Sequence, residues 1–210
     1  MAHAPTNLDI ARLIARRDRA FRAIIREVGP PPTRRRVGVQ QRFSDLAESI
    51  TYQLLATKAA TTIHARVRML CGGEVSVANV LALDVAQLRD VGLSRTKAEA
   101  MIELAESVRD GRVRVDRHGH MSDEEVIRDV TVVRGIGPWT AQMYLMHTLA
   151  RPDVWPSGDF GVRHGWSVTH ELDEMVSEAE LREAGAQFEG VRSAVAWYCW
   201  QAVDDRTRAN

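Results

Sequence analysis

The sequence predicts an all-α protein of about ten helices. Most segments repeat apolar residues every three or four positions, as Leu46 and Ile50 do. Residues suited to cap a helix, such as Ser94, precede these segments. Alternating strand pattern is confined to Val113–Val115, which is too short to build a sheet. An apolar content of 45% in 210 residues is enough for a sizeable core.

The helices can be placed from their apolar spacing and their caps. An amphipathic helix over 9–28 ends at Gly29 and the prolines after it. Further helices begin at Ser44 and Thr57. The remaining helices are expected after the caps Ser76 and Asp84, from Ser94 to near Gly111, as a pair within Ser122–Ala150, and over 159–168, 177–186 and 188–203.

Composition narrows the functional classes. Net charge is zero, so no overall basic field indicates a nucleic-acid partner, although all of the 28 basic residues except Lys58 and Lys97 are arginines. Cys71 and Cys199 are too few for a disulfide framework, a four-thiolate zinc site or an iron–sulfur cluster. No signal peptide or membrane span is visible, so the expected location is the cytoplasm.

The stretch Ser122–Ala150 contains the most informative local pattern. Ser122 and Glu125 form a capping box, and Val126, Val130 and Val133 follow at helical spacing. Gly135-Ile136-Gly137 breaks this helix with two glycines that tolerate positive φ, and Pro138 suits the start of the next. Exposed amides at a helix start attract phosphate oxygens. The stretch resembles the helix-hairpin-helix element, which grips the DNA backbone without reading bases; an ordinary helical hairpin is the alternative.

A second pattern lies downstream. Trp155-Pro156-Ser157-Gly158-Asp159 places a carboxylate at a helix start, where free amides stabilise its negative charge. A simple N-cap is the alternative reading of Asp159. The hairpin Gly135–Ala141 followed by Pro156–Val162 resembles the HhH-GPD superfamily of DNA glycosylases, and within it the 3-methyladenine DNA glycosylase II (AlkA-like) family. The likeness runs from about Phe43 to Trp200.

The resemblance implies a two-lobed helical fold with an interlobe cleft. The central lobe would comprise 43–149, including the helix-hairpin-helix at 122–149, and the second lobe 1–42 with 150–210. Too few residues precede Phe43 for the β-rich N-terminal domain that some members carry. Duplex DNA with a damaged base is the implied partner, and the target nucleotide would be flipped into the cleft. A monomer that does not bind membranes is expected, associated with the nucleoid when bound to DNA.

The resemblance also assigns site residues. Asp159 matches the catalytic aspartate, which stabilises positive charge on the deoxyribose or orients the attacking water. The base-pocket candidates are Trp139, Trp200, Phe160, Met143 and Tyr144; core packing is the alternative for Trp200. The DNA-binding candidates are Gly135, Gly137, Thr140, Arg134, Arg163, Lys97, Gln53 and Leu54, the last as the wedge that replaces the flipped base, or else a core leucine.

A monovalent cation, Na⁺ or K⁺, at the carbonyls of Val133 and Gly135 is the one cofactor considered, and no metal site built from side chains is expected. His118 and His120 would need further ligands to bind a metal.

The implied reaction is monofunctional hydrolysis of the N-glycosidic bond of alkylated purines, 3-methyladenine and 7-methylguanine. Members with lyase activity carry a lysine where this chain has Trp139, so Schiff-base strand cleavage is not expected. Cationic bases leave without a strong general acid and stack on electron-rich rings. The alternatives are a glycosylase for deaminated bases, hypoxanthine or uracil, and a non-catalytic DNA-binding module.

Two departures from the family's pattern concern the pocket. An aromatic residue often found early in the hairpin's second helix is replaced by Met143, with Tyr144 one place later. A Pro-Trp pair before the Arg-Ser of the last helix is Gly190-Val191 here. These replacements leave the lesion range open.

Overall fold

The computed structural model describes residues 5–53, 55 and 57–208. Throughout these residues the regular structure is helical, and none forms a strand. The chain divides into two compact units: unit 2 spans Arg35–Ala150, and unit 1 combines the N-terminal residues up to Arg34 with those from Arg151 onward. No helix in the described part of the chain is long and apolar enough to cross a membrane.

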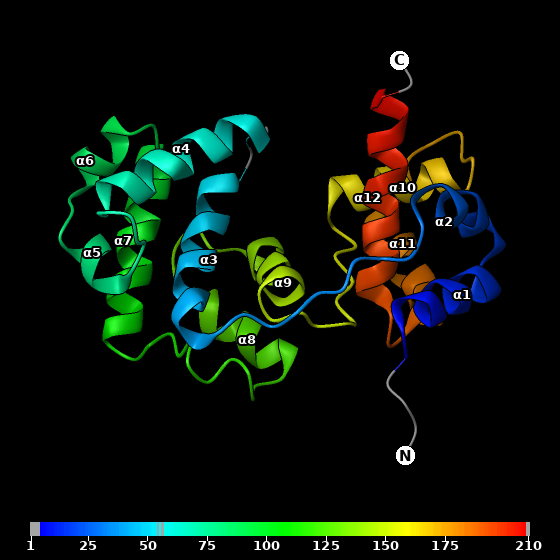
Figure 1. Cartoon of the computed structure of the whole chain (residues 1–210), viewed down its shortest axis with the longest axis horizontal. Helices are drawn as coiled ribbons and strands as arrows, with labels where there is room; N and C mark the ends of the chain where they lie inside the picture. Colours follow the sequence, from blue (N-terminus) through cyan, green and yellow to red (C-terminus); the bar gives the residue numbers. More distant parts are fainter. Residues whose placement is uncertain (1–4, 54, 56, 209–210) are drawn as a thin grey trace. The chain divides into compact units, whose positions relative to one another are not determined.

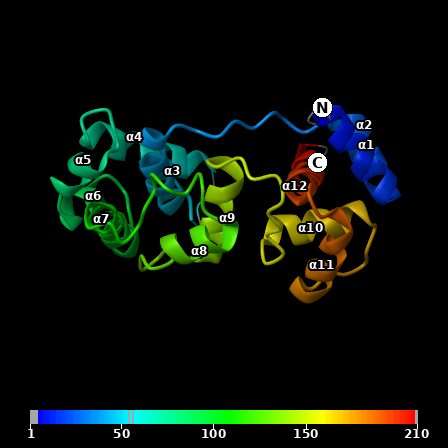
Figure 2. The same cartoon turned by 90° about the horizontal axis from the view of Figure 1, so that it is seen from below.

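The described residues of unit 2 form seven helices in chain order: α3 Val39–Tyr52, α4 Thr57–Leu70, α5 Val77–Leu81, α6 Val85–Asp90, α7 Arg95–Arg109, α8 Asp123–Val130 and α9 Pro138–His147 (Figure 1). Helix α3 contacts α4, α7 and α9. It contributes Leu46 and Ile50 to the core, and both are fully buried. Figure 2 shows α8 and α9 side by side, which places the hairpin between them at the surface of this unit.

Unit 1 contains α1 Asn7–Arg17, α2 Arg22–Val28, α10 Phe160–Thr169, α11 Glu178–Ala184 and α12 Arg192–Arg208, with two 3₁₀ turns, Arg19–Phe21 and Gly185–Phe188. Helices α10 and α12 lie directly against each other (Figure 2). A Cβ on Gly165 would lie 1.8 Å from the carbonyl oxygen of Cys199, so only glycine permits this approach. The ring of Phe21 packs against Trp166, Phe188 and Tyr198 in the core.

The predicted caps at Ser76, Asp84, Ser94 and Ser122 all precede helices, and each side chain accepts a hydrogen bond from a backbone amide of the first turn. Three predicted helices differ from the structure. Helix α3 begins at Val39 and not at Ser44, and α12 begins at Arg192 and not at Phe188, where a 3₁₀ turn ends. The single helix predicted over 9–28 is wrong. Residues 9–28 form two helices, because Asp18 is extended (φ −144°, ψ 121°) and its side chain caps the 3₁₀ turn through the amide of Ala20. The other carboxylate oxygen of Asp18 lies 2.8 Å from His170 Nε2 on the chain after α10.

Candidate DNA-binding and catalytic site

The hairpin between α8 and α9 has the predicted form. Gly135 has φ +93°, in the left-handed region, and a Cβ there would lie 3.1 Å from the Cβ of Ala100. Gly137 differs from the prediction, because its φ is −89°; it is the N-cap of α9 and forms no side-chain cap. Arg134, Gly135, Gly137 and Trp139 are exposed, whereas Ile136 is buried. No side chain caps the start of α9, whose first residue, Pro138, has no amide hydrogen, and exposed Gly137 leaves the backbone there accessible.

Gln53 connects the end of α3 to the hairpin. Its Nε2 donates to the carbonyl oxygen of Gly135 at 2.9 Å and to Thr140 Oγ1 at 2.8 Å. Thr140 is 2% exposed, and its hydroxyl accepts from Gln53 while keeping its own proton to donate. Gln53 thus positions the two residues on either side of the turn, and the DNA contacts of Gln53 and Thr140 stay predictions.

The carbonyls proposed for a monovalent cation already accept hydrogen bonds. Val133 O accepts from the amide of Ile136 at 3.0 Å, and Gly135 O accepts from Gln53. A carbonyl oxygen has two lone pairs, so each retains one, and neutral oxygens are the donors that such a cation takes. These two carbonyls could therefore still contribute to a site for Na⁺ or K⁺, and the cation there stays a prediction.

Lys97 caps the end of α3. Its Nζ donates to the carbonyls of Thr51 at 2.9 Å and Gln53 at 2.6 Å. Desolvation lowers the pKa of its ammonium. Two of its three donors are thus used inside unit 2, and the phosphate contact of Lys97, for which one donor is left, stays a prediction. Leu54, the predicted wedge, lies outside the described residues.

Asp159 is the N-cap of α10. Its Oδ1 accepts a hydrogen bond from the amide of Val162 at 2.7 Å and a second from the indole Nε1 of Trp200 at 2.9 Å. Trp200 lies on α12, so two helices fix one carboxylate oxygen. The N-cap reading of Asp159 and its catalytic assignment are compatible, because the cap orients the carboxylate.

Gly161 is a residue that sequence reasoning missed. A Cβ at this position would lie 2.9 Å from Trp200 Cδ1, 3.1 Å from Trp200 Nε1 and 3.2 Å from Asp159 Oδ1. The absence of a side chain there allows the indole to reach the carboxylate. The only signal in the sequence was a glycine inside the first turn of a predicted helix, where glycine is unfavourable.

The aromatic candidates separate by exposure. Phe160 is 66% exposed and Trp139 is 39% exposed, and Met143 and Trp200 are partly exposed. Tyr144 is fully buried, and its hydroxyl lies 2.9 Å from His118 Nδ1. The prediction of Tyr144 as a base-pocket residue is therefore wrong, because the ring belongs to the core between the hairpin helices.

His118 forms the centre of a buried polar chain. Its Nε2 lies 2.9 Å from Asp129 Oδ2 on α8, and Tyr144 on α9 contacts its other nitrogen. Burial lowers the pKa of His118 despite the nearby carboxylate. Burial opposes ionisation of Asp129, but hydrogen bonds from Arg114 and His118 outweigh it and hold its pKa below the usual value. An ionised Asp129 only accepts, so Nε2 carries the proton and Nδ1 accepts from Tyr144.

Arg163 also has an internal contact. Its Nε donates at 2.8 Å to the carbonyl of Val176, which secures the loop after α10. The terminal nitrogens of the guanidinium are not used by this bond, so the phosphate contact of Arg163 stays a prediction. Nearby, Arg192 forms a two-pronged pair with Asp153, with Nη2···Oδ2 at 2.6 Å. Among the described residues no three His, Cys, Asp or Glu side chains are grouped to hold a metal.

An all-helical fold, an exposed glycine hairpin between two helices and a fixed N-cap carboxylate together indicate a protein of the helix-hairpin-helix class. A family model described as "HhH-GPD superfamily base excision DNA repair protein" matches residues 47–188. Because the match covers more than half of the chain, the protein belongs to this superfamily.

The chain is similar to DNA-3-methyladenine glycosylase 1 of Schizosaccharomyces pombe, with 26% identity over 187 residues that cover 88% of this chain and 82% of the yeast protein. The solved structure of the S. pombe 3-methyladenine DNA glycosylase in complex with abasic DNA matches with a TM-score of 0.84, covering 91% of this chain and 95% of that one. The Bacillus halodurans DNA-3-methyladenine glycosidase structure matches with a TM-score of 0.81 at 27% identity, covering 99% of this chain and 95% of that one.

Proposed function

We propose that this protein is a DNA-3-methyladenine glycosylase of base excision repair. The substrate would be duplex DNA carrying an alkylated purine, and the reaction would hydrolyse the bond between that base and its deoxyribose. Membership of the superfamily and the similarity to glycosylases named for this lesion support the proposal. The observation that carries it is the carboxylate of Asp159, fixed by Val162 and Trp200.

The proposed chemistry follows from this carboxylate. Departure of a cationic base leaves positive charge on the sugar, and an oriented negative group stabilises that charge without reorganising during the reaction. The two hydrogen bonds on Oδ1 hold the group in one orientation. The same carboxylate would orient the attacking water.

The hairpin would anchor the DNA backbone. The start of α9 is the positive end of its helix dipole, and Gly137 at this end is exposed, so a phosphate oxygen can approach it closely. Exposed Arg134, next to Gly135, adds a positive charge at the turn. Such contacts position the duplex and carry no sequence information. A monovalent cation on the carbonyls of Val133 and Gly135 would add positive charge beside that phosphate.

The bases would be recognised by aromatic stacking. Trp139 and Phe160 are exposed large aromatic residues, one in each unit. A methylated purine carries positive charge and is attracted to the face of an indole or phenyl ring. Trp139 stands where lyase members carry lysine, and Lys97 Nζ is bound to two carbonyls, so we propose hydrolysis without strand cleavage.

Duplexes that each carry one lesion test the proposal. Base release from 3-methyladenine and 7-methylguanine is expected, with strand breaks appearing only after alkali. A deaminated-base glycosylase would instead release hypoxanthine or uracil, and a binding module would release nothing. Borohydride trapping of a covalent enzyme–DNA adduct would contradict the monofunctional reaction.

A further inference from the structure

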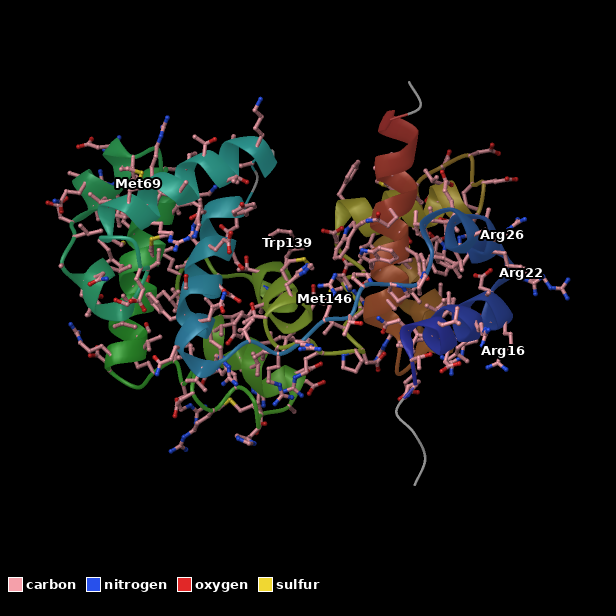
Figure 3. All side chains as sticks on the ribbon, viewed as in Figure 1. Arg16, Arg22, Arg26, Met69, Trp139 and Met146 are labelled. Carbon is pink, nitrogen blue, oxygen red and sulfur yellow. The ribbon has the colours of Figure 1, made fainter. Side chains whose placement is uncertain are left out.

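The N-terminal helices of unit 1 carry a set of arginines that the proposed site does not use. Six arginines of this segment are exposed: Arg12, Arg16, Arg17, Arg19, Arg22 and Arg26. Arg12 pairs with Asp9, and Arg17 donates to the carbonyl of Glu189. Figure 3 shows Arg16, Arg22 and Arg26 projecting from α1 and α2 on one side of unit 1, away from its helices. These three residues are called the arginine face below.

The arginine face is electrostatically unfavourable for the isolated protein. Within the described part of the chain none of its three members forms an ion pair. Arg22 and Arg26 stand four positions apart on one helix, where like charges repel. Arg22 is also the first residue of α2, the end at which the helix dipole disfavours a cation. The negative end of the helix dipole stabilises the charges of Arg16 and Arg26, which lie in the last turns of α1 and α2. It does not stabilise the charge of Arg22.

Two of these side chains are held in place by the backbone. Arg22 Nε donates to the carbonyl of Ala15 at 3.1 Å, and Arg26 Nε donates to the carbonyl of Arg22 at 3.2 Å. Each bond orients a planar guanidinium through its inner nitrogen. The two terminal nitrogens form the fork that matches phosphate oxygens. Fixing the side chain beforehand reduces the entropy lost when a phosphate binds.

We propose that the arginine face binds the phosphate backbone of duplex DNA, as a contact separate from the hairpin. The inference rests on the proposed function, which makes duplex DNA the partner. The chain has no net charge, so its attraction to DNA depends on local gatherings of positive charge such as this one. A duplex is a regular linear polyanion that several forks engage together. The contact supplies sequence-independent affinity that holds the enzyme on undamaged DNA.

The test compares two triple variants with the same change in charge. The test variant is Arg16→Gln/Arg22→Gln/Arg26→Gln. The control is Arg95→Gln/Arg109→Gln/Arg182→Gln, which removes three exposed arginines that are paired with Glu99, Asp110 and Glu178. Affinity for a long undamaged duplex is measured over a range of salt concentrations, after melting curves show that both variants are folded.

The logarithm of affinity should fall less steeply with the logarithm of salt concentration in the test variant. The slope should decrease by about 2 to 3, close to one unit for each phosphate that the variant no longer neutralises. Affinity at low salt should fall by at least about tenfold, whereas the control stays within about twofold. An Arg→Lys version of the test variant should keep most of the slope, because it keeps the charge.

Equal slopes in the test variant and the control would overturn the proposal. So would unchanged duplex affinity together with lost binding to vesicles of anionic lipid, which would make a membrane surface the partner. Single-turnover base release from a short lesion duplex at saturating enzyme should not change in the test variant. A wild-type protein that releases no base from any lesion would contradict the proposed function, while the salt slope would still decide the role of the arginine face.

Discussion

The indole nitrogen of Trp200 donates a 2.9 Å hydrogen bond to Asp159 Oδ1, and the amide of Val162 donates to the same oxygen. A tryptophan on the last helix thus fixes the carboxylate at the start of α10. The relationship gives Trp200 a role that stacking alone does not require, since a phenylalanine ring would stack but has no N–H to donate.

Replacing Trp200 by phenylalanine should remove the donor while keeping an aromatic ring. A hydrogen bond to a charged group is worth about 1.5–3 kcal/mol, so single-turnover base release should slow by roughly 10- to 100-fold. Trp197→Phe on the same helix is the matched control and should have little effect. Equal loss in both variants would assign the defect to packing of α12.

Adding a methyl group at Gly161 should have a similar effect. In Gly161→Ala the new Cβ would lie 2.9 Å from Trp200 Cδ1, so the indole must move away from Asp159. Because both substitutions break one contact, the double variant with Trp200→Phe should be no slower than the worse single variant. Gly38→Ala is the control, since nothing lies within 4 Å of its Cβ. Additive losses would show that the two residues act separately.

Loss of the hydrogen bonds by which Gln53 joins the end of α3 to the hairpin should weaken DNA binding. Gln53→Met keeps the side-chain length but loses the donors to Gly135 and Thr140, each worth about 0.5–1.5 kcal/mol. Affinity for undamaged duplex should fall by roughly tenfold. Gln40→Met, an exposed change at the other end of α3, should leave affinity unchanged. If the Gln53→Met variant bound undamaged duplex with normal affinity, the hairpin held by these hydrogen bonds would not contribute to DNA binding as proposed.

Stability should depend on pH through His118. Burial lowers its pKa in the folded protein, so below about pH 6.5 the unfolded chain binds a proton that the folded chain excludes. The stabilisation is complete above that pH and is lost as the pH falls toward the folded pKa, by up to about 1.4 kcal/mol per pH unit. Urea unfolding from pH 7 to pH 5 measures this loss.

His118→Gln should flatten the dependence between pH 7 and pH 5, whereas His64→Gln, at the other histidine with a lowered pKa, should leave the contribution of His118 in place. Tyr144→Phe retains His118 but leaves its Nδ1 without this partner, which should cost about 1–3 kcal/mol at pH 7. Tyr52→Phe, which removes an exposed hydrogen bond to Thr61, should cost far less. A pH dependence of His118→Gln equal to that of the wild type would refute the role of this histidine.

Structural features that depend on neighbouring residues could be predicted from the sequence. The caps at Ser94 and Ser122 and the turn at Gly135 depend on interactions within a few residues, so spacing and residue type suffice to predict them. The split at Asp18 was missed because apolar spacing continues through it, while its partner His170 lies far along the chain. The contact between Asp18 and His170 helps to fix the point at which the first helix ends, and the local sequence does not reveal it.

Long-range contacts explain what spacing does not predict at the site. Lys97 and Thr140 match the family's DNA-contact pattern, but their internal partners are Thr51 in α3 and Gln53 directly after it, and no spacing rule pairs residues so far apart. Tyr144 was assigned to the pocket because its neighbour Met143 occupies the aromatic position, whereas the helical turn between them directs the tyrosine to His118. The Asp159 loop was found from the resemblance, and Gly161 from the structure alone.

Base release by Asp159→Asn tests the central claim most directly. Asparagine is as good an N-cap as aspartate, so the start of α10 should be kept and only the negative charge lost. Asp84→Asn makes the same change at the N-cap of α6 and is the control. With methylated duplex and saturating enzyme, the account predicts loss of 3-methyladenine release in Asp159→Asn, retained duplex binding, and normal release in Asp84→Asn. Release at the wild-type rate by a folded Asp159→Asn protein would contradict it.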